Sequence, residues 1–275
     1  MRTPDASADR WSGDDSVTPA ALGAVAQVFV DDLDALDVAP DDEHHLAHVL
    51  RLRPGETVVA SDGVGRWRAC RFTGVAERAD LAAPILEADG PVVVTVRGAP
   101  EVTVAFVPVK GDRPEWVVQK LTEAGVDRIV VLASLRAVVR WEGERRSRAV
   151  QRLRRVAREA AAQSRRPWLP ELVGGAGLDD LSRQLAPVPL ALAHLGGAPP
   201  SLDVPAVAVG PEGGWEPSEV QGRTLVGLGP NVLRAETAAV AAGLLLCALR
   251  EGVVGPAPGL ASPRPGTNHR PPVPG

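Results

Sequence analysis

The sequence predicts an α/β protein in which a small β domain precedes a larger domain with a mainly parallel sheet. Two observations predict this division. Between residues 26 and 98, short β-rich runs alternate with turn signals. From residue 101, the continuous apolar runs VTVAFVPV and RIVVLAS flank a helical stretch, a pattern typical of strands buried on both faces. A chain of 275 residues is long enough for two modest cores.

The small domain is predicted from its strands and turns. Its β-rich runs are AQVFV, ETVVAS, RWRACRFTGV and VVVTVRG, and its turn signals are RPGE, SDGVG and ADGP. The stretch DDEHHLAHVLRL is the one helical segment, with Leu46, Val49 and Leu50 expected on one side. We expect a compact barrel.

The larger domain opens with a strand, a helix and a second strand. Asp112 is a candidate N-cap, Pro114 lies in the first turn, Glu115 completes a capping-box pattern, and Gly125 ends the helix. Further strands are expected at 189–195, 206–210 and 224–229, and helices at 143–163 and about 236–250. The buried stripe of the long helix is predicted to be Val150, Leu153, Val156, Ala157 and Ala160.

The two ends of the chain differ from the middle in composition. Residues 1–25 are polar and acidic, and residues 252–275 are a Pro/Gly-rich segment, so both are predicted to be disordered tails. The predicted domains are therefore 26–98 and 99–251.

Composition excludes several protein classes. Apolar residues make up 45% and charged residues 23%, and no apolar run is long enough to span a membrane. The N-terminus has no apolar core of a secretory signal. Cys70 and Cys247 lack metal-site spacing, and Cys247 lies in an apolar run. His44 and His48 share a helix face without an evident further ligand. We expect a cytoplasmic protein that uses neither a membrane nor a metal.

The charges are unevenly distributed. Residues 1–43 hold 11 acidic residues and 2 arginines, whereas 136–166 hold 11 arginines and 3 acidic residues. Such a basic segment attracts a polyanion, although a solvated helix face is the simpler alternative. The chain has only two lysines, Lys110 and Lys120, both in KGDRPEWVVQKLTEAG. A compact ammonium there could reach a phosphate or base edge where a guanidinium does not fit.

Two loops are candidates for a binding site. In VAVGPEGGWEPSEV (207–220), a buried strand ends at Gly210 and a Gly-rich turn leads into a short helix. Ligands of open α/β sheets bind at such carboxyl ends, although a tight turn alone also explains the glycines. LGPNVLRAETAA (228–239) repeats the design, with Thr237 as a candidate cap. Neither a P-loop nor a Rossmann fingerprint is present.

Several motifs, in order, resemble one known family. KGDRPEWVVQKLTEAGV, EAAAQSRR, GPEGGW and LGPNVLRAETA, together with HHLAHVLRLRPGE, are similar to the RsmE family of ribosomal RNA uridine-N3 methyltransferases. The likeness covers about residues 26–250. Trp215 replaces a phenylalanine of the family pattern, Asn231 an arginine, and Ala162 a glutamate.

This resemblance implies a PUA-like β-barrel followed by a SPOUT-type α/β domain with a deep trefoil knot. It implies S-adenosylmethionine as cofactor, a homodimer, and 16S rRNA of the small ribosomal subunit as partner. The implied cofactor residues are Val209, Gly210, Pro211, Glu212, Gly213, Gly214, Leu228, Gly229, Val232, Leu233 and Thr237, with a third wall around His194 and Gly196.

The resemblance also suggests roles in chemistry and RNA binding. Arg234 is the candidate that stabilises a uracil anion, and Glu236 is a candidate base or orienter, or a salt-bridge partner of Arg234. The implied RNA-binding residues are Arg51, Arg53, Lys110, Arg113, Lys120, Arg140, Arg165 and Arg166.

Three other functions remain open from the sequence. The first is a related methyltransferase that modifies a ribose 2′-hydroxyl, and the second is a non-catalytic RNA-binding protein of the same fold. The third, a small-molecule Rossmann enzyme, lacks its glycine fingerprint.

Overall fold

The computed structural model describes residues 18–74, 85–111, 113–134, 136, 141 and 143–255. Its N-terminal part holds a five-stranded sheet in the order β1-β2-β3-β4, with β5 also paired to β3. The strands are β1 (Ala26–Phe29), β2 (Thr57–Ser61), β3 (Arg66–Phe72), β4 (Leu86–Ala88) and β5 (Val93–Val94). β1 and β2 are parallel, and the other pairs are antiparallel.

Three helical turns accompany this sheet. They are the 3-10 helix η2 (Pro19–Leu22), α1 (Pro40–His44) and the π-helical η3 (His45–Val49). Leu46 is buried as predicted, but Val49 and Leu50 are exposed because the π turn shifts the register of the helix. The presence of η2 also shows that ordered structure starts before residue 26, the predicted end of the tail. Residues 1–17 and 256–275 of the two predicted tails lie outside the described residues.

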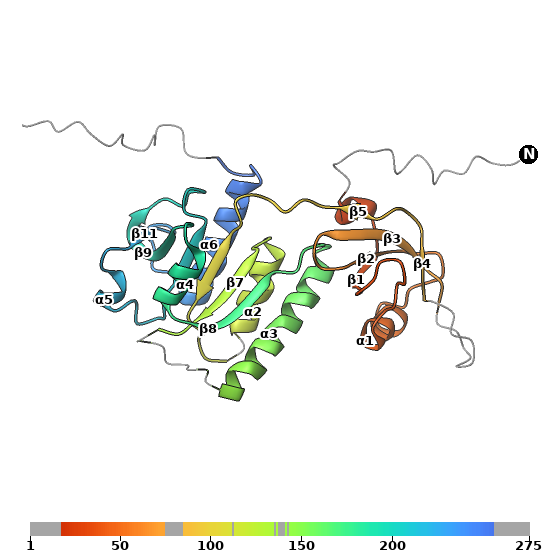
Figure 1. The fold of residues 1–275 in the computed structure, drawn as a ribbon, viewed down its shortest axis with the longest axis horizontal. Helices are drawn as coiled ribbons and strands as arrows, with labels where there is room; N and C mark the ends of the chain where they lie inside the picture. Colours follow the sequence, from red (N-terminus) through yellow and green to blue (C-terminus); the bar gives the residue numbers. More distant parts are fainter. Residues whose placement is uncertain are drawn as a thin grey trace, which may run out of the picture.

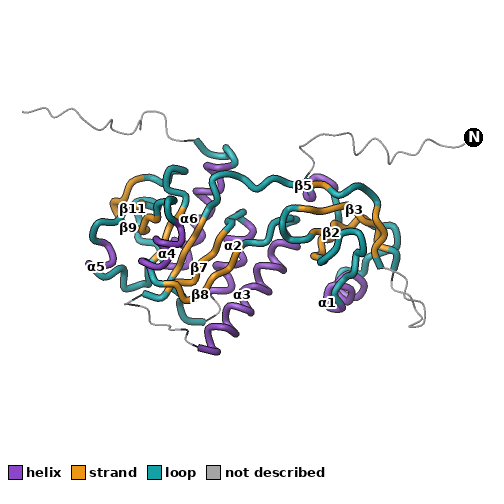
Figure 2. Tube along the Cα trace, in the orientation of Figure 1, coloured by secondary structure: helices purple, strands orange, loops and turns teal. Residues whose placement is uncertain are grey.

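The C-terminal part is a six-stranded, wholly parallel sheet in the order β11-β9-β10-β6-β7-β8. The strands are β6 (Thr103–Phe106), β7 (Arg128–Leu132), β8 (Glu171–Ala176), β9 (Leu190–Ala198), β10 (Ala206–Val209) and β11 (Thr224–Val226). The helices are α2 (Arg113–Glu123), α3 (Gly143–Gln163), α4 (Leu178–Leu185), α5 (Pro217–Val220) and α6 (Ala235–Arg250). Helices cover both faces, with α2, α3 and α6 on one and α4 on the other (Figure 2).

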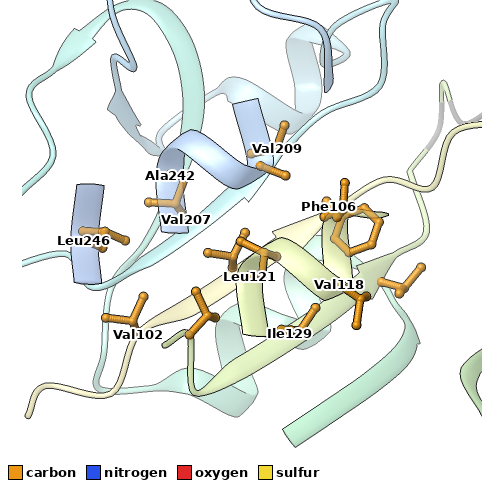
Figure 3. Close-up of a cluster of buried hydrophobic side chains, with 14 of the residues drawn as sticks. Val102, Phe106, Val118, Leu121, Ile129, Val207, Val209, Ala242 and Leu246 are labelled. Atoms are coloured by element: carbon orange, nitrogen blue, oxygen red, sulfur yellow. The ribbon is translucent and has the colours of Figure 1, made fainter. Parts of the chain in front are cut away.

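Alternation along the central strands creates the two cores. In β6, Val104 and Phe106 face α2 and α6, whereas Ala105 faces the α4 side. Figure 3 shows the first core, in which α2, with Leu121, and α6, with Leu246, pack over the sheet and against each other. Gly243 allows this approach, because a Cβ there would lie 2.5 Å from Leu121 Cδ2. The predicted helix and strand assignments from residue 101 are therefore confirmed, although neither β8 nor α4 was among them. The predicted N-cap Asp112 lies outside the described residues.

The long helix α3 joins the two parts of the molecule. It begins near the carboxyl edge of the parallel sheet and ends against β1 (Figure 1). The segment that follows it packs on the N-terminal sheet: Gln27 Nε2 donates to the Arg166 carbonyl at 2.8 Å, and Leu169 N donates to the Gly63 carbonyl at 2.8 Å. Trp168 Nε1 donates to the Thr95 carbonyl at 2.9 Å. The two parts are thus hydrogen-bonded to each other through backbone groups.

Asp127 lies at this junction and is 3% exposed. Its carboxylate binds Arg166 Nη2 at 3.3 Å, lies 3.9 Å from Arg97 Nε, and forms an ion pair with Arg250 Nη1. The Val102 N–H also donates to it at 2.9 Å. Burial would make a lone carboxylate costly, and these partners offset that cost. We call Asp127, Arg97, Arg166 and Arg250 the Asp127 cluster.

Candidate functional site

A pocket of about 670 Å³ lies at the carboxyl edge of the parallel sheet. Three segments line it: the end of β9 (193–195), the loop after β10 (209–215), and the loop from β11 into α6 (228–235). β9, β10 and β11 are neighbours or near neighbours in the sheet, so their carboxyl ends converge on one place. The volume falls within the range of ordinary small-molecule sites.

Trp215 holds two of these segments together. Its ring is buried, and its Nε1 donates to the Ala193 carbonyl at 3.3 Å. The phenylalanine usual in the family has no such donor. Gly210 makes room for the ring, because a Cβ there would lie 2.9 Å from Trp215 Cε2. This glycine therefore serves packing within the loop as well as the shape of the pocket.

Two arginines hold the 210–216 loop from outside. Arg113, at the start of α2, lies 3.3 Å from Glu212 Oε1 and 3.6 Å from Glu236 Oε1, so it bridges the loop to the first turn of α6. Arg136 donates to the Gly213 carbonyl at 2.9 Å and to Glu216 at 2.5 Å. The hydrogen bond to Glu216 raises the pKa of Arg136 above its ordinary value.

Sequence reasoning did not predict these loop contacts for either arginine. The available signal was the acidic residues Glu212 and Glu216 within a Gly-rich loop, which require cationic partners.

Arg234 is the charged side chain best placed for chemistry. It lines the pocket, is exposed, and its guanidinium makes no hydrogen bond or ion pair with any described residue. Its backbone is the N-cap of α6, and no side chain caps that helix, so Thr237 does not have the predicted capping role. An uncommitted guanidinium at a ligand pocket can bind a developing negative charge.

Glu236 lies beneath the loop rather than in the pocket lining. Its side chain is 12% exposed and faces Arg113, so the suggested ion pair with Arg234 is not formed. Its Oε2 atom is buried and has no hydrogen-bond partner among the described residues. The geometry favours a role in holding Arg113.

Most of the predicted cofactor residues meet in the pocket. Nine line it: Val209, Gly210, Pro211, Glu212, Gly214, Leu228, Gly229, Val232 and Leu233. Gly213 and Thr237 do not line it, and of the predicted third wall His194 does, but Gly196 does not.

The predicted RNA-binding residues are not brought together. Arg51 and Arg53 are exposed on the N-terminal part, and Arg140 lies outside the described residues. Lys120 Nζ is paired with Glu123 at 2.8 Å. Lys110 lines a second hollow, beside α3.

Arg165 and Arg166 have structural roles instead. Arg165 donates to the Val25 carbonyl at 2.6 Å, and Arg166 donates to the Val126 carbonyl at 2.7 Å besides binding Asp127. Burial lowers the pKa of Arg166 to about 10. Both guanidiniums are occupied at the junction, so we remove them from the RNA-binding set.

The described residues offer neither a metal cluster nor a membrane-spanning helix. Within the described ranges, no group of three or more His, Cys, Asp or Glu side chains is arranged to hold a metal ion. His44 and His48 lie with ring centroids 4.8 Å apart. In the same part of the chain, no helix combines the length and apolarity needed to cross a bilayer.

Two family models match the sequence. One, described as an RNA methyltransferase domain, matches residues 97–246, and the other, described as an RNA methyltransferase PUA domain, matches residues 39–79. The first match contains all three loops of the pocket, and the described part of the second, residues 39–74, lies within the N-terminal part.

Individual relatives agree with these matches. Ribosomal RNA small subunit methyltransferase E of Mycobacterium bovis is 36% identical over 229 residues, covering 77% of this chain and 86% of the relative. A methyltransferase of Legionella pneumophila, solved with the cofactor SAM, has a TM-score of 0.67 at 25% identity and covers 81% of this chain and 96% of its own. The S-adenosyl methionine-bound methyltransferase E of Neisseria gonorrhoeae has a TM-score of 0.61 at 24% identity, covers 82% of this chain and 97% of its own, and shares the fold.

Proposed function

Because the chain belongs to the RNA methyltransferase family, we propose that it methylates N3 of a uridine in 16S rRNA of the small ribosomal subunit. S-adenosylmethionine is the methyl donor. The observation that carries this proposal is the pocket built from three loop segments at one sheet edge, with an uncommitted arginine at its mouth. Both the curated relative and the family-model matches support the same class of reaction.

The pocket lining fits the cofactor. Apolar side chains of Val209, Leu228 and Leu233 offer a surface for the adenine, while backbone groups of the 210–214 loop are available for polar contacts. The bound cofactor supplies an electrophilic methyl group, so no metal is needed for the transfer. The loops hold it rigidly because Trp215, Arg113 and Arg136 brace them.

Arg234 acts on the substrate base. Methylation at N3 requires loss of the weakly acidic N3 proton, which leaves negative charge spread over the ring and its two oxygens. A guanidinium beside those oxygens stabilises that charge, and a pocket wall that excludes water strengthens the effect. We assign this role to Arg234 because its donors are not used by any described residue.

Two roles were suggested for Glu236, general base and orienter, and we assign it the orienting role. Its carboxylate lies next to Arg113, which in turn reaches Glu212 in the cofactor loop. Loss of Glu236 would free Arg113 and loosen that loop.

The deciding experiment is methyl transfer from labelled S-adenosylmethionine to unmodified small ribosomal subunits, followed by nucleoside identification by mass spectrometry. We expect 3-methyluridine, and we expect Arg234→Ala to reduce kcat by about 10²-fold or more while cofactor binding is kept. A ribose-methylated product would retain the family and overturn the target atom. Cofactor binding without transfer would mean that the substrate is a different RNA, and the absence of both transfer and cofactor binding would favour a non-catalytic RNA-binding protein.

We further propose a homodimer that works in the cytoplasm. Leu244 on α6 and Val232 and Leu195 at the pocket rim are exposed apolar residues. A second copy covering them would bury this surface next to the cofactor site. Light scattering coupled to size exclusion should give twice the monomer mass, and Leu244→Glu should give the monomer. The monomeric mass for the unaltered chain would refute the dimer.

The trefoil knot of the family is proposed as well. The neighbouring 209–215 and 228–235 loops and the packing of α6 on β6 and β10 are compatible with a threaded C-terminal segment. A knotted chain pulled from its two ends should extend to less than its full contour length in a force measurement. Extension to the full length would exclude the knot.

A further inference from the structure

A second hollow, of about 800 Å³, lies along α3 and is basic. The loop after β6 forms one side of it, Trp141 forms another, and the outward face of α3 forms the rest. Five cations line it, and none of its described lining residues is acidic: Lys110, Arg145, Arg148, Arg152 and Arg155. We refer to these five residues and Trp141 as the α3 cradle.

The cations of the α3 cradle are not equally available. Arg148 binds Glu144 at 2.7 Å, and Arg152 is paired with Glu115. Lys110, Arg145 and Arg155 form no ion pair or hydrogen bond with any described side chain. Three uncompensated charges in one hollow are therefore free to bind an anion.

The spacing of these charges suits an extended polyanion. Arg145, Arg148, Arg152 and Arg155 recur every three or four residues, so they share one face of α3 over about 15 Å. A single phosphate would use only part of this row, whereas consecutive phosphates of a nucleic-acid strand would use its length.

Trp141 adds an aromatic surface to the basic row. Its side chain is half-buried, packs against the main core of the C-terminal part, and lines both the α3 cradle and a neighbouring hollow. A ring fixed on one side and open on the other is suited to stacking an unpaired base. Double-stranded RNA keeps its bases inside the helix and cannot offer one.

The α3 cradle also has the right position. Lys110 precedes the α2 residue Arg113 by three positions, and Arg113 contacts the cofactor loop at Glu212. At its other end, α3 reaches the N-terminal part, where Arg158 Nη2 donates to the Phe29 carbonyl at 2.9 Å. A strand lying along α3 would therefore lead from the N-terminal part to the carboxyl edge of the parallel sheet, near which α3 begins (Figure 1).

We propose that the α3 cradle binds a single-stranded RNA segment, with phosphates on Lys110, Arg145 and Arg155 and one unstacked base on Trp141. This inference rests on the proposed RNA substrate. It adds that the bound segment is single-stranded and names the residues that bind it.

The test measures binding of a labelled oligouridylate of about twelve nucleotides to the full chain by fluorescence anisotropy across a salt series. The slope of log K against log salt is negative, and each lost phosphate contact reduces its magnitude by about 0.7 for single strands. Arg155→Ala should lower it by about that amount, and the triple variant with Lys110→Ala and Arg145→Ala by about 2. Arg183→Ala, an exposed arginine on α4, is the matched control and should leave it unchanged.

Trp141→Leu separates stacking from charge. It should weaken binding at least about fivefold with no change in the salt slope, and Trp141→Phe should restore most of the affinity. Equal slopes for Arg155→Ala and Arg183→Ala would overturn the proposal, as would a duplex that competes as well as the single strand. Methyl transfer by the unaltered enzyme is assayed in parallel, so failure of the α3 cradle is distinguishable from failure of the proposed reaction.

Discussion

Arginines from one basic stretch of sequence have opposite fates in this molecule. Arg166, at the end of the stretch, lies in the Asp127 cluster, where its guanidinium binds Asp127 and backbone carbonyls. Arg145 and Arg155, from the middle of the same stretch, face the α3 cradle without a described partner. The difference shows that the total charge of a segment overstates what it can bind, because burial first commits some of the side chains.

The largest expected effect comes from removing the anion of the Asp127 cluster. Asp127→Asn removes the buried carboxylate that three guanidiniums share and leaves Arg166 without an acidic partner among the described residues, so we expect a loss of about 3–5 kcal/mol in the free energy of unfolding. Urea denaturation measures it. Asp179→Asn is the control, because that carboxylate is paired with Arg223 but is 81% exposed, and its loss should cost about 1 kcal/mol or less.

Arg166 and Arg155 should separate stability from RNA binding. Arg166→Ala removes a buried partner of Asp127 and should destabilise the fold by about 2–4 kcal/mol without changing the salt slope of RNA binding. Arg155→Ala should change stability by no more than about 0.5 kcal/mol. Thermal unfolding and the anisotropy series are run on both proteins. A large loss of stability in Arg155→Ala would contradict the distinction between arginines that stabilise the fold and arginines that are free to bind RNA.

Arg113 occupies a middle position, because its partners belong to the cofactor site. Arg113→Gln should weaken S-adenosylmethionine binding by about tenfold, since Glu212 and the buried Glu236 lose their shared cation. Isothermal calorimetry measures the dissociation constant. Lys120→Gln is the control. Lys120 lies on the same helix but is paired with Glu123, so this variant should bind the cofactor like the unaltered chain.

The smallest expected effect is a change in the labelling rate of the two cysteine thiols, which reports whether the junction opens. Burial raises the pKa of Cys70 and of Cys247 from 9.0 to about 11, so both thiols should alkylate slowly at pH 8. Because the folded pKa is raised, their contribution to stability is complete below pH 9 and is lost as the pH approaches 11.

The same thiols respond differently to the junction variant. Cys247 senses the charges of Arg250 and Asp127, so Asp127→Asn should speed its labelling but not that of Cys70, as mass spectrometry would show. Equal acceleration at both sites would mean that the whole protein, and not the junction, had loosened.

Sequence patterns predicted the elements whose burial is periodic. The strands β6, β7 and β10 were predictable because their residues are apolar on both faces, and α3 because its apolar positions recur every three or four residues. β8 was missed because ELVGGA has two glycines. They are required there, since a Cβ on Gly174 would lie 2.4 Å from Val150 Cγ2 on α3. That requirement arises from tertiary packing and leaves no local signal.

The site shows the same limit. Its three loops could be predicted because each follows an apolar strand, and nine of the eleven predicted cofactor residues line the pocket. The partners of its charged residues could not be predicted, because Arg113 meets Glu212 and Glu236 across 99 and 123 positions of sequence. The destinations of Arg165 and Arg166 depended equally on how the two parts pack.

Helix α3 has a consequence for the geometry of the substrate. Its 21 residues form an unbroken rod of about 30 Å, with one end near the carboxyl edge of the parallel sheet and the other fixed to the N-terminal sheet. Because the rod has a fixed length, an RNA bound at both ends of α3 must place its target uridine at a fixed distance from a second recognition feature. Inserting one helical turn would change that distance by about 5 Å. The enzyme would then choose its uridine by distance as well as by base identity.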